Sequence, residues 1–476
     1  MANREYDLIV IGAGAVGENI ADRAVHGGLS VVIVESELVG GDCSYWACMP
    51  SKALLRSGIA LRAAQHLGGA KQAVTGELDV AAVFARRNSI THDWDDQSQV
   101  DWVAEAGIDL VRGHARFTAP KEVTVTAEDG TVTILTARNA VAVSVGSDPL
   151  LPDIPGLADA APWTSRDATS AQQAPGSLAI IGGGVVGCEM ATAYASFGTE
   201  VTLIARGGLL SGNEPFAGEH VADGLRQLGA TVALGVSPAS VTREGSRVVL
   251  RLDDGSTVTA DEVLVASGRV PRTSELGLEA IGLTPGDWLQ VDDTMLVKGF
   301  DWLYACGDVN HRALLTHQGK YQARAAGDVI AARATGRAVN DRPWGTHVAT
   351  ADHEAVPQVI FTDPEVASVG LSAAAAEKAG YDIRVVDYEL GWVSGASLQA
   401  DGYKGQARMV VDEKRKVILG VTFVGQDVAE MIQAATIAIV GEVPLDRLWH
   451  AVPAYPTMNE IWLRLLESYG RPHDWI

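Results

Sequence analysis

The stretch Tyr6-Asp7-Leu8-Ile9-Val10-Ile11-Gly12-Ala13-Gly14-Ala15-Val16-Gly17 decides the fold of this 476-residue chain. Its apolar half predicts a strand buried on both faces, and a helical pattern follows the glycines. A second apolar strand, residues 30–34, ends at Glu35. Strand, glycine-rich turn, helix, strand and terminal acid are together typical of a dinucleotide-binding βαβ unit, in which the glycines approach a pyrophosphate and the acid accepts hydrogen bonds from a ribose. The glycines are Gly12, Gly14 and Gly17.

The same pattern recurs from Ser177, where an apolar strand runs into a second glycine-rich turn and a second strand follows at residues 200–204. The glycines of this second fingerprint are Gly182, Gly184 and Gly187. Two fingerprints predict two dinucleotide sites, one for a flavin and one for a nicotinamide coenzyme. The second strand ends in Arg206 instead of an acid, and an arginine there would pair with a 2′-phosphate. NADPH is therefore favoured over NADH, the alternative being that Arg206 is a solvated surface residue.

Two cysteines, Cys43 and Cys48, stand in residues 40–52 at the start of a predicted helix. A helix N-terminus lowers the pKa of a thiol, because unpaired N–H groups and the positive end of the dipole face it. Two thiols little more than one turn apart can close a disulfide and reopen it by exchange. We interpret the pair as redox-active, since four cysteines in the whole chain are too few for a disulfide-stapled secreted protein. Cys188 and Cys306 are expected to pack as small hydrophobes.

The composition is that of a globular protein, with 47% hydrophobic and 20% charged residues, and the length suggests about three domains. A formal charge of −22 argues against a nucleic-acid or anionic-membrane partner. No apolar run approaches the length of a transmembrane helix, and no apolar signal region precedes the first strand. We therefore expect a soluble cytoplasmic protein.

Segments that contain proline and glycine indicate where the domains divide. Residues 149–155 are proline-rich and indicate a crossover linker, and residues 266–271 have the pattern of the return connection. Beyond about residue 345 short strands alternate with helices, which is typical of a separate α+β domain. The expected strands are residues 358–361, 409–412 and 417–424, and the expected helices are residues 373–379 and 428–440.

On these motifs the chain resembles the class I pyridine nucleotide-disulfide oxidoreductases, which include dihydrolipoamide dehydrogenase, glutathione reductase, mycothione reductase and mercuric reductase. Both fingerprints, the Cys-x4-Cys-x-Pro-Ser-Lys box, the Ala-Ser-Gly-Arg-x-Pro segment and the Ala-x-Gly-Asp motif occur in the family's order. The resemblance implies an α/β fold with two Rossmann-like domains and a C-terminal α+β dimerisation domain. The FAD-binding domain would comprise residues 1–150 and 270–345, the NAD(P)H-binding domain residues 151–269, and the dimerisation domain residues 346–476.

The resemblance also implies roles for single residues. Cys48 would be the thiolate that lies against the flavin, and Cys43 the interchange thiol that meets the acceptor. Lys52 and Glu189 would form the ion pair beside the flavin N5; outside these motifs they would be read as surface charges. Asp308 would bind the ribityl chain. Further cofactor-binding positions are Gly146 and Gly268.

The chain departs from the family near its C-terminus. The stretch Tyr455-Pro456-Thr457-Met458-Asn459-Glu460 places a tyrosine where disulfide-reducing relatives have the histidine that exchanges the thiol proton. A phenol, with a pKa near 10, is a poor base at neutral pH, so lipoamide and glutathione-type disulfides are disfavoured. Tyr455 and Glu460 remain candidate catalytic residues. No cysteine follows Cys306, including in residues 470–476, whereas mercuric reductase delivers its metal through a C-terminal cysteine pair.

These observations predict a homodimeric FAD enzyme, with its active site shared across the interface, that oxidises NADPH, with NADH as the alternative coenzyme. Electrons would pass through the Cys43–Cys48 disulfide to a small acceptor, which is a disulfide, a metal ion or an electrophile; no resident metal is expected. The rival reading is an NAD(P)H:quinone-type reductase whose disulfide is idle or regulatory, and a third is a non-enzymatic flavin-bearing sensor. Tyr45 and Trp46, between the cysteines, either fill core space or shape the acceptor pocket.

Overall fold

The computed structural model describes residues 2–471, and residues 472–476 of the cysteine-free C-terminus lie outside the described part. The chain forms two compact units. Unit 1 comprises Met1–Pro50, Asn88–Leu150 and Arg269–Asp352, and unit 2 comprises Ser51–Arg87, Leu151–Gly268 and His353–Ile476. The chain thus passes between the units at both predicted linkers, and residues 51–87 group with unit 2. The division into three domains stays a prediction.

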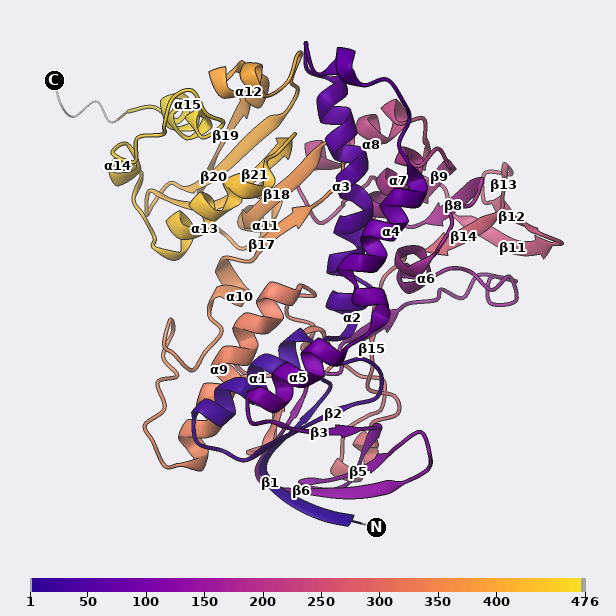
Figure 1. Cartoon of the computed structure of the whole chain (residues 1–476). Coiled ribbons are helices and arrows are strands. Elements are labelled where there is room, and N and C mark those ends of the chain that lie inside the picture. Colours follow the sequence, from indigo (N-terminus) through magenta and orange to yellow (C-terminus); the bar gives the residue numbers. More distant parts are fainter. Residues whose placement is uncertain (1, 472–476) are drawn as a thin grey trace. The chain divides into compact units, whose positions relative to one another are not determined.

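Unit 1 is built on a seven-stranded sheet in the order β3-β2-β1-β6-β5-β4, with β16 also paired to β6 (Figure 1). Its strands are β1 (Ala2–Ile11), β2 (Val31–Glu35), β3 (Asp109–Arg112), β4 (His114–Ala119), β5 (Glu122–Thr126), β6 (Val132–Val143) and β16 (Leu303–Ala305). Strands β3, β2, β1, β6 and β16 run parallel, whereas β4 and β5 join β6 as an antiparallel meander. A separate antiparallel pair is formed by β7 (Ser147–Pro149) and β15 (Arg269–Pro271).

Helices α1 and α9 pack against each other in unit 1 (Figure 1). The helices of this unit are α1 (Ala15–His26), α2 (Gly41–Tyr45), α5 (Gln97–Glu105) and α9 (Thr316–Ala334), with the 3₁₀ turns η2 (His92–Trp94), η3 (Leu278–Ile281) and η4 (Asp308–Asn310). Helices α3 (Cys48–Gln65), α4 (Val80–Ile90) and α10 (Ala351–Glu354) cross between the units. Glycines allow the close approach of α1 and α9: a Cβ on Gly319 would lie 2.6 Å from Val16 Cγ2.

The core of unit 1 lies on both faces of β1, as the unbroken apolar pattern predicts. Leu8 and Val10 pack into a cluster with residues of α1 and α9, while Ile9 and Ile11 pack into a second cluster with β4, β5 and β6. All four side chains are at most 3% exposed. Because successive side chains of a strand point to opposite faces, this burial fixes the register of β1 and holds the glycine turn at its carboxyl end.

Unit 2 contains a parallel sheet in the order β10-β9-β8-β14, an antiparallel meander β11-β12-β13 and a five-stranded antiparallel sheet β17-β18-β21-β20-β19. The strands are β8 (Ser177–Ile181), β9 (Glu200–Ala205), β10 (Thr231–Leu234), β11 (Pro238–Glu244), β12 (Arg247–Leu252), β13 (Thr257–Ala260), β14 (Glu262–Val265), β17 (Pro357–Ile360), β18 (Glu365–Gly370), β19 (Ile383–Glu389), β20 (Gln406–Asp412) and β21 (Val417–Gly425). The helices are α6 (Ser165–Ser170), α7 (Val185–Ser196), α8 (Pro215–Gln227), α11 (Ala373–Lys378), α12 (Ser394–Gln399), α13 (Ile432–Val440), α14 (Leu445–Leu448) and α15 (Glu460–Tyr469), with the 3₁₀ turns η1 (Lys71–Ala73), η5 (Leu390–Trp392) and η6 (Ala429–Met431).

In the second βαβ unit, as in the first, the first strand is buried on both faces. Leu178 and Ile180 of β8 pack in a cluster with α7 and α8, and Ala179 and Ile181 pack in another with the meander. The predicted α+β character of the C-terminal region is confirmed. Its sheet is joined to α8 by Glu214, whose carboxylate lies 2.8 Å from Arg408 Nη1 and accepts a hydrogen bond of 2.7 Å from the N–H of Ala373.

Candidate functional site

At two positions of the first glycine turn, Gly12 and Gly17, a side chain has no room. Gly12 has φ of +98°, and a Cβ there would lie 2.6 Å from the carbonyl oxygen of Ser144. A Cβ on Gly17 would lie 1.9 Å from the carbonyl oxygen of Gly12. By contrast, the nearest atom to a Cβ on Gly14 is 3.8 Å away, so the backbone is open at this point. The turn is an uncrowded cradle at the N-terminus of α1, which fits a pyrophosphate.

Glu35, the last residue of β2, contacts the backbone of the first glycine turn. Its Oε2 accepts a hydrogen bond of 2.7 Å from the N–H of Ala13, and its Oε1 accepts one of 2.8 Å from the N–H of Glu37. Burial raises the pKa of Glu35, while these backbone bonds act in the opposite direction. Each carboxylate oxygen has a second lone pair for a ribose hydroxyl. The donor set of unit 1 therefore fits the adenosine end of FAD.

Asp308 follows the carboxyl end of β16, at the same end of the parallel strands as Glu35. Its Oδ2 accepts a hydrogen bond of 2.5 Å from Ser147 Oγ, and burial raises its pKa. Arg269 lies 3.8 Å from the same carboxylate and 3.5 Å from Asp42, which ties the cysteine segment to β15. Gly146, just before Ser147, has φ of +76° and open space around a Cβ. Gly268, with φ of +144°, is the last residue of unit 2 before Arg269.

The cysteine segment forms a short helix and then a new one. Cys43 lies inside α2, Trp46 breaks the helix, and Cys48 is the first residue of α3. Both cysteines are partly exposed thiols, and Cys48 Sγ lies 3.2 Å from Thr316 Oγ1. A hydrogen bond to Cys48 and then burial raise the pKa of Cys43. Cys43 lies in the first turn of the short helix α2, but its hydrogen bond to Cys48 and its burial act against the lowering of the pKa that a helix N-terminus favours.

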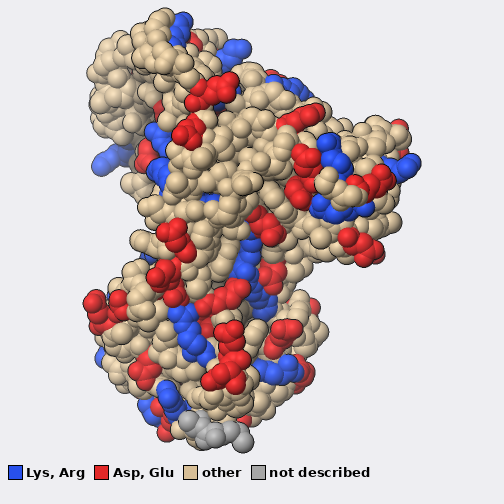
Figure 2. All heavy atoms as spheres, turned by 45° about the vertical axis from the view of Figure 1, so that its right-hand side comes forward, with Lys and Arg blue, Asp and Glu red and all other residues tan. Residues whose placement is uncertain are grey.

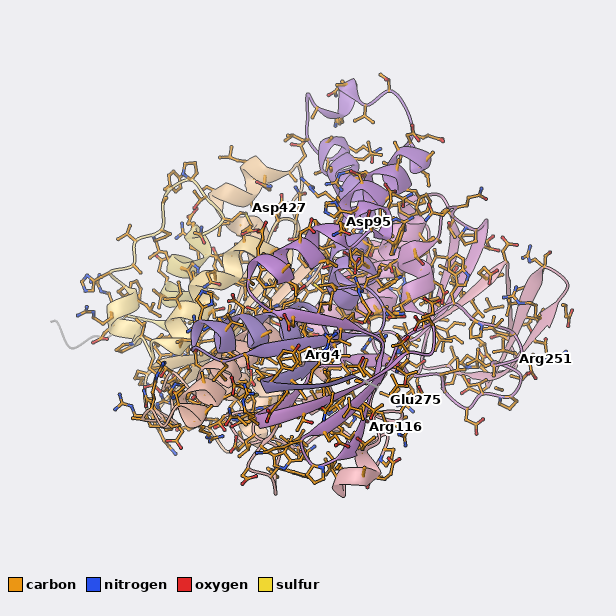
Figure 3. All side chains as sticks on the ribbon, turned by 60° about the horizontal axis from the view of Figure 1, so that its bottom comes forward. Arg4, Asp95, Arg116, Arg251, Glu275 and Asp427 are labelled. Carbon is orange, nitrogen blue, oxygen red and sulfur yellow. The ribbon has the colours of Figure 1, made fainter. Side chains whose placement is uncertain are left out.

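The other two cysteines behave as expected for packed side chains. Cys188 and Cys306 are at most 1% exposed, and burial raises the pKa of both, that of Cys188 to about 12. Tyr45 is 1% exposed and therefore fills core space. Gln99 Nε2 donates to its hydroxyl at 3.2 Å, and the hydroxyl contacts the carbonyl oxygen of Asp95 (labelled in Figure 3) at 3.5 Å. Its neighbour Trp46 is half-buried and packs edge-on against the Tyr45 ring.

Unit 2 contains the second cradle. A Cβ on Gly182 would lie 2.3 Å from the carbonyl oxygen of Ala266, and one on Gly187 would lie 1.9 Å from that of Gly182. No atom lies within 4 Å of a Cβ on Gly184, so this turn is open in the same way as the first. Arg206 follows β9 and is exposed, without an ion pair among the described residues.

Lys52 and Glu189 lie together within unit 2. Lys52 Nζ is 2.8 Å from Glu189 Oε2 and 4.9 Å from the centre of the Phe361 ring. The Glu189 carboxylate, 4% exposed, also accepts a hydrogen bond of 3.0 Å from the N–H of Phe361. Lys52 stands one helical turn after Cys48 in α3. The pair is therefore a charged group on the helix that begins with Cys48.

The two candidate residues near the C-terminus, Tyr455 and Glu460, lie in different surroundings. Tyr455 is 73% exposed, whereas Glu460 is buried. The Glu460 carboxylate accepts hydrogen bonds of 2.6 Å from Arg464 and 3.1 Å from the N–H of Ser394, and no hydrogen bond joins it to Tyr455 in the described structure. Large apolar side chains are exposed on the same C-terminal region: Trp392, Leu398, Ile437 and Val452. Such exposure is typical of a surface that another chain covers.

Family models match nearly the whole chain. Residues 6–351 match the model described as pyridine nucleotide-disulphide oxidoreductase, and residues 356–465 match the dimerisation domain of that group. The chain belongs to this family. The chain is 30% identical over 462 residues to mercuric reductase of Staphylococcus aureus, covering 96% of this chain and 81% of the relative. It is also 30% identical over 467 residues to dihydrolipoyl dehydrogenase of Chlamydia muridarum, covering 97% and 96% of the two chains.

A solved structure has the same fold. The Cu(II) complex of the HOCl-induced flavoprotein disulfide reductase RclA of Escherichia coli superimposes with a TM-score of 0.83 at 22% identity, covering 98% of this chain and 99% of that one. Membership makes this pyridine nucleotide-disulphide oxidoreductase an FAD-dependent enzyme with a redox disulfide, and the dimerisation domain supports a homodimer. The predicted family, fold class and FAD are therefore confirmed.

None of the described helices is long and apolar enough to cross a membrane. Acidic and basic side chains are interspersed over the face shown in Figure 2. Among the described residues no group of three or more His, Cys, Asp or Glu side chains is arranged to hold a metal ion.

Several site residues carry no sequence signal. Thr316 contacts Cys48 across 268 positions of the chain, and no local pattern links them. Asp42 forms ion pairs with Arg269 at 3.5 Å and Arg272 at 3.6 Å, which the sequence separates by more than 200 positions. Only the Ser-Gly-Arg segment, already marked as a return connection, hinted at Arg269.

Proposed function

We propose that this oxidoreductase takes electrons from NADPH and delivers them through Cys43 and Cys48 to a small acceptor that reacts at Cys43. The observation that carries the proposal is the cysteine pair itself. Its two thiols share a hydrogen bond, both are partly exposed, and they lie in the unit that holds the FAD cradle. Bound FAD supplies two-electron transfer between a nicotinamide and a disulfide.

Other residues of the chain would bind the two cofactors and position the reacting groups. The glycine cradle, Glu35 and Asp308 would hold FAD, and Gly182, Gly184 and Gly187 would hold the coenzyme. Lys52, fixed by Glu189, would place a positive charge beside the flavin ring. Cys48, at the N-terminus of α3 and in contact with Thr316, would hold the sulfur next to the flavin, and Cys43 would exchange with the acceptor.

Arg206 supports the choice of NADPH. It stands directly after β9, at the position where an acid would bind the ribose of NADH, and its guanidinium is exposed and unpaired among the described residues. A guanidinium binds a phosphate in bidentate fashion, whereas a carboxylate there would repel it. The test is the ratio of kcat/KM for NADPH over that for NADH.

The acceptor is a disulfide, a soft metal ion or an electrophile, because each of these reacts with a thiol. One relative is named for a metal ion, as mercuric reductase, and another for a dithiol compound, as dihydrolipoyl dehydrogenase. Two thiols alone offer a metal ion few ligands, and the described structure adds no third one. We therefore favour an electrophile over a metal ion, and also over lipoamide and glutathione-type disulfides, because Tyr455 is a poor base at neutral pH.

Turnover of the Cys43→Ser variant tests the proposal. NADPH oxidation with disulfide and electrophilic acceptors should fall at least a hundredfold, because the exchange thiol is lost. Cys188→Ala, which removes a buried and unreactive thiol, is the matched control and should keep its activity. Quinone turnover that survives the loss of both cysteines, in Cys43→Ser/Cys48→Ser, would instead favour the rival quinone-type reductase, which the tyrosine at position 455 motivates.

A further inference from the structure

The short helix that carries Cys43 is held by the turn η2 and the first turn of α5, which lie in the same unit. Trp94 Nε1 donates a hydrogen bond of 3.1 Å to the carbonyl oxygen of Tyr45, the last residue of α2. Gln99 Nε2 donates hydrogen bonds of 3.2 Å to Ser44 Oγ and of 3.2 Å to Tyr45 Oη. The two residues that follow Cys43 are therefore fixed by side chains from another part of the chain.

The start of α2 is held by the same segment. The N–H of Val39, just before the helix, donates a hydrogen bond of 2.7 Å to Asp96 Oδ2. The N-cap residue Gly40 has φ of +110°, and a Cβ there would lie 2.2 Å from Gln99 Nε2. Both ends of α2 thus contact residues 94–99.

The turn that presents Trp94 has an uncommon backbone. His92, Asp93 and Trp94 form η2 with φ of +50°, +51° and +59°, respectively. Such left-handed values bring the Cβ of an L-residue close to the following carbonyl oxygen, so they are exceptional for a bulky residue such as Trp94. A run of three persists only where the surrounding structure fixes it, and strained turns of this kind cluster at active sites. Here the turn directs the Trp94 indole to the Tyr45 carbonyl.

The helix α2 cannot hold Cys43 in place by itself. An isolated helix of five residues does not persist in water, because fixing its first turn costs more free energy than its few hydrogen bonds supply. Trp46, with φ of −136°, separates α2 from α3, so Cys43 and Cys48 do not share one continuous helix. The position of Cys43 beside Cys48 therefore depends on contacts outside α2.

The contacts of α2 differ in where they lead. Asp42 forms an ion pair of 3.5 Å with Arg269, which also lies 3.8 Å from the proposed FAD ligand Asp308. The hydrogen bond of Trp94, by contrast, ends on the segment between the two cysteines. Variants of Trp94 therefore report on the position of Cys43 without removing a residue assigned to FAD.

We propose that Trp94 and Gln99 are positioning residues that hold Cys43 beside Cys48 and so make the Cys43–Cys48 disulfide harder to reduce. The inference deepens the proposed function and rests on it, because the reduction potential of the pair matters only if the pair carries electrons. Two thiols that are kept close together form a disulfide more readily than two that move apart, since less conformational freedom is lost. Trp94 and Gln99 thus lower the reduction potential of the pair.

Exchange with dithiothreitol measures this effect without turnover. The S–S bond between Cys43 and Cys48 breaks, and the pair gains two electrons and two protons and becomes two thiols. One dithiothreitol molecule loses these electrons and protons and closes its own S–S bond. The equilibrium constant of the exchange gives the reduction potential of the pair relative to that of dithiothreitol, and a tenfold change in this constant corresponds to about 30 mV.

The experiment compares holoenzymes equilibrated anaerobically in mixtures of reduced and oxidised dithiothreitol. The reaction is quenched, thiols are alkylated with iodoacetamide under unfolding conditions, and mass spectrometry of the tryptic peptide that ends at Lys52 gives the reduced fraction. Trp94→Phe keeps an aromatic ring but removes the N–H, and Gln99→Met keeps the length of the side chain but removes both donated hydrogen bonds. Each should shift the equilibrium toward the dithiol about three- to tenfold, which raises the reduction potential by about 15–30 mV.

Two matched controls come from α5. Trp102→Phe removes the N–H of a tryptophan that is 39% exposed. Gln97→Met removes an exposed amide that donates to Asp101 at 2.7 Å. Both variants should keep the wild-type reduction potential.

Two variants of the exposed Asp93 test the turn itself. Asp93→Pro should raise the reduction potential at least as much as Trp94→Phe, because proline cannot adopt a positive φ and the indole is no longer directed to α2. Asp93→Gly should keep the wild-type reduction potential, because glycine adopts a positive φ readily. Equal potentials for Asp93→Pro and Asp93→Gly would contradict the role of the turn.

The two proposals fail in different ways. If Trp94→Phe and Gln99→Met keep the wild-type reduction potential, or shift it downward, the positioning role is overturned. If the wild-type pair exchanges with dithiothreitol but is not reduced by NADPH in the same alkylation assay, the proposed function falls, whatever the variants show. Bound-flavin absorbance and unfolding temperature establish that each variant is folded. If Asp93→Pro does not fold, Trp94→Phe and Gln99→Met decide the question by their reduction potentials.

Discussion

Replacing Lys52 by methionine tests how the buried Glu189 carboxylate is held. In the structure Lys52 Nζ is 2.8 Å from Glu189 Oε2, and the side chains are 35% and 4% exposed, respectively. Methionine keeps the length and apolar stem of the lysine, which packs on Phe361, but removes the charge. The carboxylate would then retain only the N–H of Phe361, at 3.0 Å, as its partner.

The magnitude follows from the burial of the pair. Removing one partner of a buried ion pair costs about 3–5 kcal/mol, because the other charge is left uncompensated. Since Lys52 is partly exposed, water screens the pair and one backbone hydrogen bond remains, so we expect a loss of about 2–3 kcal/mol. For a unit of this size such a loss lowers the unfolding temperature by about 4–10 °C.

Differential scanning calorimetry at a fixed excess of FAD measures this loss, since ligand binding contributes to apparent stability. The double variant Lys52→Met/Glu189→Gln removes both charges and should regain at least half of the lost stability. Lys298→Met, at an exposed site without a carboxylate partner in the described residues, should change stability by less than about 0.5 kcal/mol. Equal unfolding temperatures for the wild type and Lys52→Met, with no recovery in the double variant, would refute the reasoning.

Three further outcomes are expected. Gly17→Ala should reduce bound FAD at least tenfold, since its Cβ would lie 1.9 Å from a carbonyl oxygen. The flavin absorbance of the purified protein measures this loss, and Gly76→Ala, where a Cβ has open space, is the control. Full flavin content in Gly17→Ala would count against the FAD-binding role of this turn. Arg206→Gln should raise KM for NADPH about tenfold and leave KM for NADH unchanged; steady-state kinetics that change equally with both coenzymes would contradict it. Burial raises the pKa of Glu365 from 4.5 to about 6, so the wild type loses stability between these pH values as the group ionises. Glu365→Gln should therefore match the wild type in acid and exceed it by about 1–2 kcal/mol above pH 6 in thermal unfolding, and a pH-independent difference would rule this out.

The parts of the fold that could be predicted are those marked by short, continuous sequence patterns. The apolar runs ending at Ile11 and Ile181 mark strands buried on both faces, and the glycine spacing after each marks a turn that no side chain can enter. The apolar run and the glycine spacing can each be recognised from neighbouring residues, although the atom that excludes a Cβ at Gly12 belongs to the distant Ser144. The fold class, the family and FAD therefore followed from motifs.

The rest depends on contacts between distant residues. Thr316 contacts Cys48 only because α9 packs along α1. The raised pKa of Cys43 was not predictable either, because it results from the hydrogen bond to Cys48 and from burial. Tyr45 looked like a possible pocket residue, but its burial follows from Gln99 and Asp95, about 50 positions away.

The most direct test of the central claim is an anaerobic titration of the oxidised holoenzyme with NADPH, followed by its visible spectrum. If Cys43 and Cys48 lie on the electron path, each flavin should take up two electron pairs, and a long-wavelength thiolate-to-flavin absorbance should appear midway. Uptake of a single pair that bleaches the flavin without this absorbance would contradict the account and leave the cysteines off the path.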